Sequence, residues 1–110
     1  MALSEQLINE LINLVDETNV LLDESDLQHY GGDWCRQYSP NPSAIVFPRS
    51  TEHVQKVLKW ANENKVAIVP SGGRTGLSGG ATAMNGEVVV ALDKMNRVVS
   101  SDTVAGTITV

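Results

Sequence analysis

The chain has 110 residues, with 13 acidic and 8 basic side chains, a formal charge of -5 and 42% hydrophobic residues. This length fits one domain, and the hydrophobic fraction is too high for a disordered chain. The acidic balance and the absence of a Lys and Arg cluster argue against binding to nucleic acid, which requires neutralised phosphates.

The first 42 residues predict two helices and a stretch of irregular chain. Six apolar side chains recur at helical spacing and indicate an amphipathic helix over residues 3–15, namely Leu3, Leu7, Ile8, Leu11, Ile12 and Val15. Ser4 is a suitable N-cap for this helix. The stretch at residues 22–42 is polar and contains Gly and Pro pairs, so we expect a short helix at residues 25–30 followed by irregular chain.

Strands and a helix alternate in the middle of the chain. Short apolar runs typical of buried strands lie at residues 44–47, 66–69 and 88–92. Between the first two runs, apolar spacing predicts a helix that is capped by Ser50 or Thr51 and stops near Asn64. Short strand-helix-strand connections favour a parallel crossover. The predicted fold class is therefore α/β, with a small three-stranded parallel sheet flanked by helices.

The last four residues, 107–110, read as a strand. Because natural domains seldom end inside a strand, we expect the chain to be a fragment of a longer parent protein. The alternative is that this strand pairs at a sheet edge. Apolar surface on the severed side of a fragment would favour self-association.

A glycine-rich segment at residues 70–80 follows the second predicted strand and holds five of the nine glycines. Such glycines let successive backbone N–H groups converge on an anion, and ligands of open α/β sheets lie beyond the carboxyl ends of the strands. The spacing matches neither the Rossmann fingerprint nor the P-loop. We therefore predict a different phosphate-binding loop, with Arg74 as a charge-assisted contact. A plain glycine hairpin leading to the third strand is the alternative.

Together with the Lys-Met-Asn-Arg-Val run at residues 94–98 and the Asp33-Trp34 pair, these ordered motifs resemble the FAD-linked oxidases of the vanillyl-alcohol-oxidase (PCMH-type) superfamily. The likeness covers residues 20–110 and the N-terminal part of the FAD-binding domain. The subgroup that the chain resembles most is the D-2-hydroxy acid dehydrogenases, which act on D-lactate, glycolate or D-2-hydroxyglutarate. The resemblance implies FAD as cofactor and an oxidoreductase parent that converts a small D-2-hydroxy acid into its 2-keto acid.

The resemblance also implies which residues bind the cofactor. The FAD pyrophosphate would be wrapped mainly by backbone N–H groups of Ser71, Gly72, Gly73, Arg74, Thr75, Gly76, Gly79 and Gly80. Pro48 would lie near the adenosine end. Arg74 stands where members with covalently attached flavin usually have a histidine, so noncovalent FAD is implied.

The whole flavin domain of such proteins is α+β and has two lobes. By resemblance, residues 1–43 are an N-terminal helical segment, residues 44–100 the first FAD-binding lobe, and residues 101–110 the start of a truncated second lobe. The catalytic groups and the pocket for the 2-hydroxy acid would belong to missing domains. We therefore assign no catalytic residue and expect the chain alone to be inactive.

The number of cysteines and the N-terminal sequence indicate where in the cell the protein is located. Cys35 is the single cysteine, and no thiol and imidazole spacing indicates a metal site. Nothing resembles a secretory signal or the roughly 20 apolar residues of a transmembrane segment. We expect an intracellular protein, either cytoplasmic or, as the parent, peripheral to the inner membrane.

Two rival functions remain open on the sequence. One is a non-redox module that binds another phosphate or nucleotide. The other is an interaction module in which the helix at residues 3–15 binds a partner protein; packing of that helix against its own sheet would contradict it. Trp60 is expected to pack against a neighbour such as this first helix.

Overall fold

The computed structural model describes residues 2–110. Its helices are α1 (Glu5–Val15), α2 (Glu24–Tyr30) and α3 (Thr51–Glu63), with a 3-10 turn at Glu17–Asn19. Its strands are β1 (Val20–Leu21), β2 (Ala44–Val46), β3 (Ile68–Ser71), β4 (Val88–Ala91), β5 (Ser100–Asp102) and β6 (Thr107–Thr109). The three predicted helices and the four predicted strands are confirmed, with boundaries shifted by up to two residues.

The main sheet has the strand order β1-β2-β4-β3. Strands β2, β4 and β3 are parallel, with Val46 and Pro70 both in register with Val90. The predicted α/β class and the parallel triplet are thus confirmed. The sheet also has a fourth strand that was not predicted, because β1 pairs antiparallel with β2 and places Val20 opposite Val46. Two residues are too few to show the alternation by which a strand is recognised in a sequence.

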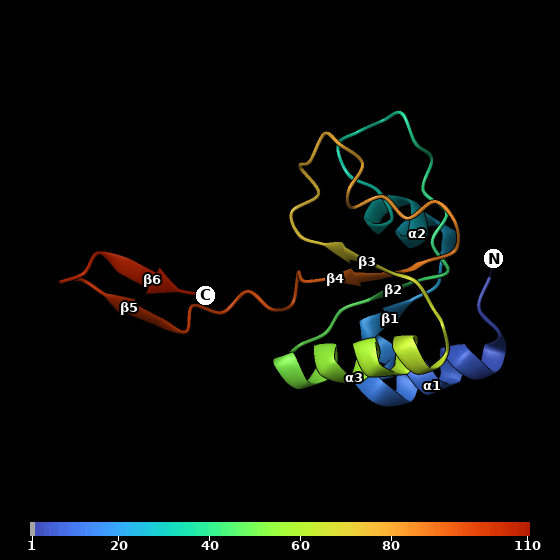
Figure 1. Ribbon diagram of the computed structural model, residues 1–110, viewed down its shortest axis with the longest axis horizontal. Coiled ribbons are helices and arrows are strands. Elements are labelled where there is room, and N and C mark those ends of the chain that lie inside the picture. Colours follow the sequence, from blue (N-terminus) through green and yellow to red (C-terminus); the bar gives the residue numbers. More distant parts are fainter. Residues whose placement is uncertain (1) are drawn as a thin grey trace.

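Helices cover the two faces of this sheet. Figure 1 shows α1 and α3 on one face and α2 on the other. Successive strand side chains point to opposite faces, so Val88 and Val90 pack with Leu11 and Trp60 under the helix pair. Val89 packs in a second cluster that includes the hydrophobic residues Ile45, Phe47, Ala83 and Ala91.

Helix α1 is part of the hydrophobic core. The hydroxyl of Ser4 accepts a hydrogen bond from the N–H of Leu7 and caps the helix as predicted. Leu11 and Val15 are fully buried, and Trp60 of α3 donates through Nε1 to Glu10 at 3.1 Å. The predicted packing of Trp60 on the first helix is confirmed. The alternative of a free partner-binding helix is wrong, because its apolar face is already covered.

Helix α3 begins after Ser50, whose Oγ accepts a hydrogen bond from the N–H of His53. Of the two predicted caps, Ser50 is therefore the one used. Fully buried Val57 lies on the face that packs toward the sheet. The crossover through α3 returns the chain to β3, which lies parallel to β2 with β4 between them.

The end of the chain forms a hairpin of β5 and β6 that extends away from the main sheet (Figure 1). The predicted last strand is confirmed, and it pairs with β5, so that Ser101 lies opposite Ile108. Val104 and Ile108 are 97% and 63% exposed. Within residues 2–110, no helix has the length and apolarity required to cross a membrane.

Candidate cofactor-binding site

The carboxyl ends of three parallel strands meet at one edge of the sheet. Since Val46, Val90 and Pro70 are in register, the residues that follow them leave the sheet together. Pro48 therefore follows β2, and the glycine-rich loop, defined here as residues 72–83, follows β3 at the same edge. This is the edge at which ligands bind in open α/β sheets.

The glycine-rich loop exposes an unusual amount of free main chain. A Cβ atom added at Gly72, Gly73 or Gly80 would have no neighbour within 4 Å. Among the described residues, no backbone N–H from Gly72 to Gly80 donates a hydrogen bond to another group of the chain. Successive amide donors bordering open space suit an anionic group such as a pyrophosphate. The loop therefore fits the predicted cofactor.

The loop also contains turns that depend on glycine or on a special backbone angle. Gly79 has a φ of +75°, in the left-handed region where glycine carries no Cβ penalty. Arg74 has a φ of +56°, although it is not glycine. The side chain of Arg74 folds back onto the start of the loop. Its Nη1 donates a hydrogen bond to the Gly72 carbonyl at 3.1 Å and another to Ser71 Oγ at 3.3 Å.

The charge of Arg74 is matched inside the chain. Its Nη1 and Nη2 atoms donate to both carboxylate oxygens of Asp93, at 2.9 and 2.7 Å, and its guanidinium lies over the ring of Tyr30. The shared hydrogen bond lowers the pKa of Asp93 and raises the pKa of Arg74 from their ordinary values. Arg74 thus braces the loop against the residues after β4, and a contact from it to a phosphate would compete with Asp93.

Ser71 and Pro48 lie deeper than the loop. Both are fully buried, Ser71 as the last residue of β3 and Pro48 at the exit of β2. Pro48 follows Phe47, whose N–H donates to the carbonyl of Asn19 at 2.8 Å. These two positions therefore shape the base of the edge, whereas Gly72, Gly73 and Gly80 form its open rim.

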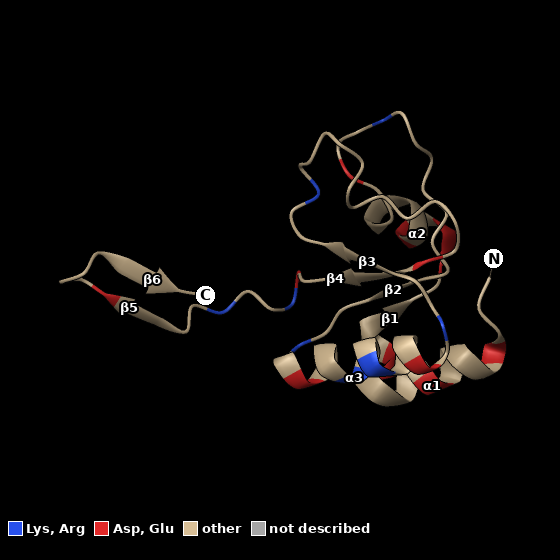
Figure 2. Ribbon diagram, in the orientation of Figure 1, with Lys and Arg blue, Asp and Glu red and all other residues tan. Residues whose placement is uncertain are grey.

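Two basic side chains near Pro48 were not predicted as site residues. Arg49 Nε and Lys94 Nζ both donate to Oδ1 of buried Asn19, at 3.1 and 2.7 Å. Arg74–Asp93 is the ion pair that the structure records in residues 2–110, so neither cation has a carboxylate partner there. Figure 2 shows basic positions on the loops that follow β2, β3 and β4. The Lys-Met-Asn-Arg-Val run contains Lys94, whereas no sequence motif marks Arg49.

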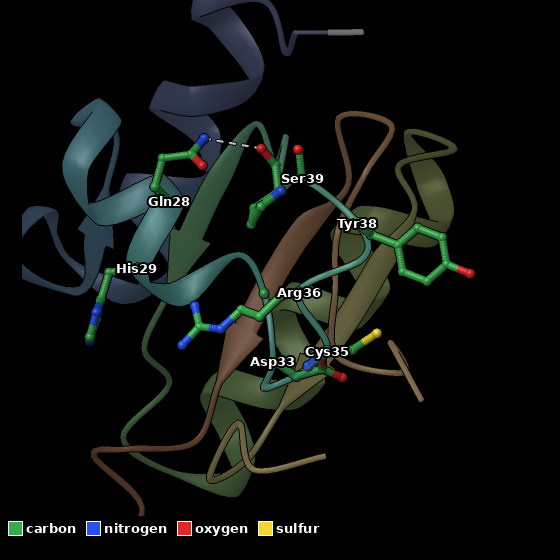
Figure 3. Close-up of a pocket in the computed structure, with 9 residues that line it drawn as sticks. Gln28, His29, Asp33, Cys35, Arg36, Tyr38 and Ser39 are labelled. Carbon is green, nitrogen blue, oxygen red and sulfur yellow. Dashed lines mark hydrogen bonds between the residues drawn. The ribbon is translucent and has the colours of Figure 1, made fainter. Parts of the chain in front are cut away.

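A separate cavity of about 370 Å³ lies beside α2 (Figure 3). Its walls are Gln28, His29, Gly32, Asp33, Cys35, Arg36, Tyr38, Ser39 and Pro40. Figure 3 shows Gln28 reaching to the carbonyl of Pro40 and Arg36 extending toward His29. None of the predicted cofactor-binding residues lines this cavity, so we do not assign it to the cofactor. Within the described range, no group of three or more His, Cys, Asp or Glu is placed to hold a metal ion.

Comparison with known proteins identifies the family of the chain and agrees with the fold. Residues 42–110 match the family described as FAD binding domain. The chain is 58% identical over 92 residues to a D-2-hydroxyglutarate dehydrogenase of Stutzerimonas stutzeri (strain A1501), covering 84% of this chain and 20% of that protein. It is 39% identical over 87 residues to a D-lactate dehydrogenase of Anaerostipes hadrus, covering 79% of this chain and 17% of that protein.

Solved structures of other proteins share the fold of this chain. The 4-ethylphenol oxidase of Gulosibacter chungangensis, solved as an isoeugenol complex, superposes with a TM-score of 0.78 at 28% identity over 92% of this chain and 21% of that one. The fold is that of the FAD-binding portion of PCMH-type proteins. The chain belongs to the FAD binding domain family. It spans about a fifth of the length of the curated relatives that it matches.

Proposed function

We propose that the glycine-rich edge binds the pyrophosphate of FAD and that the chain is the FAD-binding portion of a D-2-hydroxy acid dehydrogenase. The contacts would come mainly from backbone N–H groups of Ser71, Gly72, Gly73, Arg74, Thr75, Gly76, Gly79 and Gly80, with Pro48 near the adenosine end. One observation carries this assignment: amides from Gly72 to Gly80 that lack a partner in the described chain, at the edge where three parallel strands end.

The proposed roles of the cofactor and of this chain follow from the residues that the chain contains. FAD supplies the acceptor for the hydride that leaves the alcohol carbon of the substrate. The described residues hold the cofactor, and the pocket for the acid lies in the rest of a longer protein. We propose residues 1–43 as a helical segment, residues 44–100 as the first FAD-binding lobe and residues 101–110 as the start of the second lobe.

The proposed substrate is a small D-2-hydroxy acid, with D-2-hydroxyglutarate ahead of D-lactate. The support is the higher identity to the Stutzerimonas stutzeri dehydrogenase, 58% against 39% for the D-lactate dehydrogenase of Anaerostipes hadrus. Steady-state oxidation of both acids by the complete protein, with an artificial electron acceptor, tests this order. A higher kcat/KM for D-lactate would reverse it.

The decisive test of cofactor binding is flavin content. The complete protein should purify yellow, and acid precipitation should release the flavin into the supernatant if FAD is held noncovalently. Gly73→Val should abolish loading, because the bulky side chain would enter the open space in front of the loop. Asn13→Val, on the exposed face of α1, is the matched control and should load normally. Unchanged flavin occupancy in Gly73→Val would reject the assigned role.

A non-redox phosphate or nucleotide-binding module is the rival function. Thermal-shift measurements with FAD, FMN, ATP and NAD on the complete protein separate the two, since a larger shift with a non-flavin nucleotide would favour the rival.

We further propose a location in the cytoplasm or at the periphery of the inner membrane, in keeping with the unpaired Cys35. Exposed Val104 and Ile108 support self-association of the isolated 110 residues.

A further inference from the structure

A segment upstream of the family match holds the glycine-rich loop in place. This bracing segment, residues 31–41, precedes residues 42–110, which carry the FAD binding domain match. Three main-chain hydrogen bonds connect it to the loop. The N–H of Trp34 donates to the carbonyl of Gly76 at 3.0 Å, the N–H of Ala83 donates to the carbonyl of Gly31 at 2.8 Å, and the N–H of Asn41 donates to the carbonyl of Ala83 at 2.7 Å. The loop is therefore tied to the bracing segment in its middle and at its end.

Asp33 lies at the centre of this contact. The residue is only 9% exposed, and its Oδ1 accepts hydrogen bonds from the N–H of Cys35 at 2.8 Å and from Thr82 Oγ1 at 3.4 Å. A Cβ added at Gly76 would lie 3.5 Å from Oδ2. The carboxylate thus lies beside the loop near its middle at Gly76 and is hydrogen-bonded to it near its end at Thr82.

This carboxylate has no cationic partner among the described residues. Burying a charge without a paired cation is costly unless hydrogen bonds satisfy it. The hydrogen bonds available to Asp33 come from its own segment and from the loop. The loop therefore supplies part of the hydrogen bonding of this carboxylate, through Thr82.

The loop needs such support, because its amides from Gly72 to Gly80 have no acceptors in the described chain. A chain rich in glycine loses more conformational entropy on ordering than any other. If the loop were unsupported, the cofactor would have to supply that ordering cost when it binds. Tyr38 adds to the support, because its ring carbons lie 3.1 and 3.2 Å from where a Cβ of Gly79 would be.

We propose that Asp33 is a positioning residue for FAD, which it never touches, and that it acts by holding the glycine-rich loop in its binding conformation. This inference rests on the proposed function of the loop. The role depends on an acceptor oxygen directed at Cys35 and Thr82, so an isosteric amide at position 33 should preserve it.

The test compares Asp33→Ala with Asp33→Asn in the complete protein. Asp33→Ala should raise the dissociation constant for FAD by roughly tenfold, about 1.4 kcal/mol, because it leaves the Cys35 N–H and the Thr82 hydroxyl without their acceptor. Asp33→Asn should stay within about threefold of wild type, because it keeps the acceptor. Asp26→Ala, an acid of α2 outside the bracing segment, is the control and should bind FAD normally. FAD fluorescence quenching gives the constants, and far-UV circular dichroism confirms folding.

A second variant guards against a folding failure of Asp33→Ala. Thr82→Val removes the hydroxyl donor at nearly constant volume and should weaken FAD binding by a few fold, whereas Thr82→Ser should restore it. Hydrogen exchange of the apoprotein should show faster exchange at residues 72–83 in Asp33→Ala, and wild-type rates in Asp33→Asn.

The outcomes separate this inference from the proposed function. If Gly73→Val abolishes FAD binding while Asp33→Ala binds FAD and exchanges like wild type, the bracing role is wrong and the FAD site stands. If no variant, wild type included, binds FAD, the proposed function fails, and the exchange rates still decide whether Asp33 holds the loop. Equal losses in Asp33→Ala and Asp33→Asn would overturn the acceptor role.

Discussion

Arg74 and Asp93 form a bidentate ion pair that joins the loop after β3 to the chain after β4, with N–O distances of 2.9 and 2.7 Å. The pair lies at the carboxyl edge of the sheet, and Arg74 is held additionally over the ring of Tyr30. Because its charge is already matched, we expect main-chain donors, together with Arg49 and Lys94, to supply most of the attraction for a phosphate at this edge. The predicted direct role of Arg74 is therefore the weakest part of the proposed contact set.

The ion pair predicts a pH dependence of stability in the 110-residue chain. The pKa of Asp93 is lowered, so its contribution is present above the ordinary carboxyl pKa and is lost as the pH falls through the lowered value. Asp93→Asn should reduce stability by about 0.5–1 kcal/mol near neutral pH, a small effect because both side chains are partly exposed to water. The variant and wild type should converge once the pH falls below the lowered pKa of Asp93. Urea unfolding between these limits measures the difference.

The matched control for the ion pair is Asp26→Asn, a carboxylate of α2 for which no hydrogen bond or ion pair is recorded. Its unfolding free energy should follow that of wild type at every pH. A constant gap between Asp93→Asn and wild type across the acidic range would contradict a role for Asp93 ionisation.

A glycine at the end of α2 is predicted to be sterically required. A Cβ at Gly31 would clash with the carbonyl oxygen of Leu27 and would lie 2.8 Å from Cγ of Pro42. Gly31→Ala should therefore destabilise the chain by about 1–3 kcal/mol, as overpacking does in well-packed sites. Gly80→Ala, where a Cβ would meet nothing within 4 Å, should change the thermal midpoint little. Equal midpoints for the two variants would show that the close packing around Gly31 is not maintained in solution.

The role of α1 as core can be measured in the same way. Leu11 is fully buried between α1, α3 and the sheet, so Leu11→Ala should cost about 2–5 kcal/mol. Asn13→Ala, on the exposed side of the same helix, should leave the unfolding free energy within about 0.5 kcal/mol of wild type. Chemical denaturation followed by tryptophan fluorescence reports both. A neutral Leu11→Ala variant would mean that α1 is not docked as described.

The isolated 110 residues should bind FAD far more weakly than the complete protein does. They offer one wall of the site, while the ordering cost of the cofactor is undiminished. Isothermal titration calorimetry on both proteins measures the difference. A dissociation constant for the isolated chain equal to that of the complete protein would show that the described edge is the whole binding site.

Periodic and compositional signals account for most of what could be foreseen. The apolar stripe with its Ser4 cap predicted α1, and the Val-rich run at β4 predicted a strand buried on both faces. The glycine pattern predicted a loop after the second parallel strand, and the structure has this loop after β3, while its binding of a ligand stays a prediction. β1 was missed because two residues carry no period, and the Asp33 contact was missed because its partner Thr82 lies 49 positions away.

The sequence by itself determined the order of helices and strands and the glycine-rich segment, because each depends on residues close together in the chain. Only the tertiary structure decided which side chains surround the loop and which of them are already paired. It paired Arg74 with Asp93, buried Ser71 and Pro48, gathered Arg49 and Lys94 on Asn19, and set Asp33 against the loop. These are contacts between residues far apart in the chain, and no local pattern encodes them.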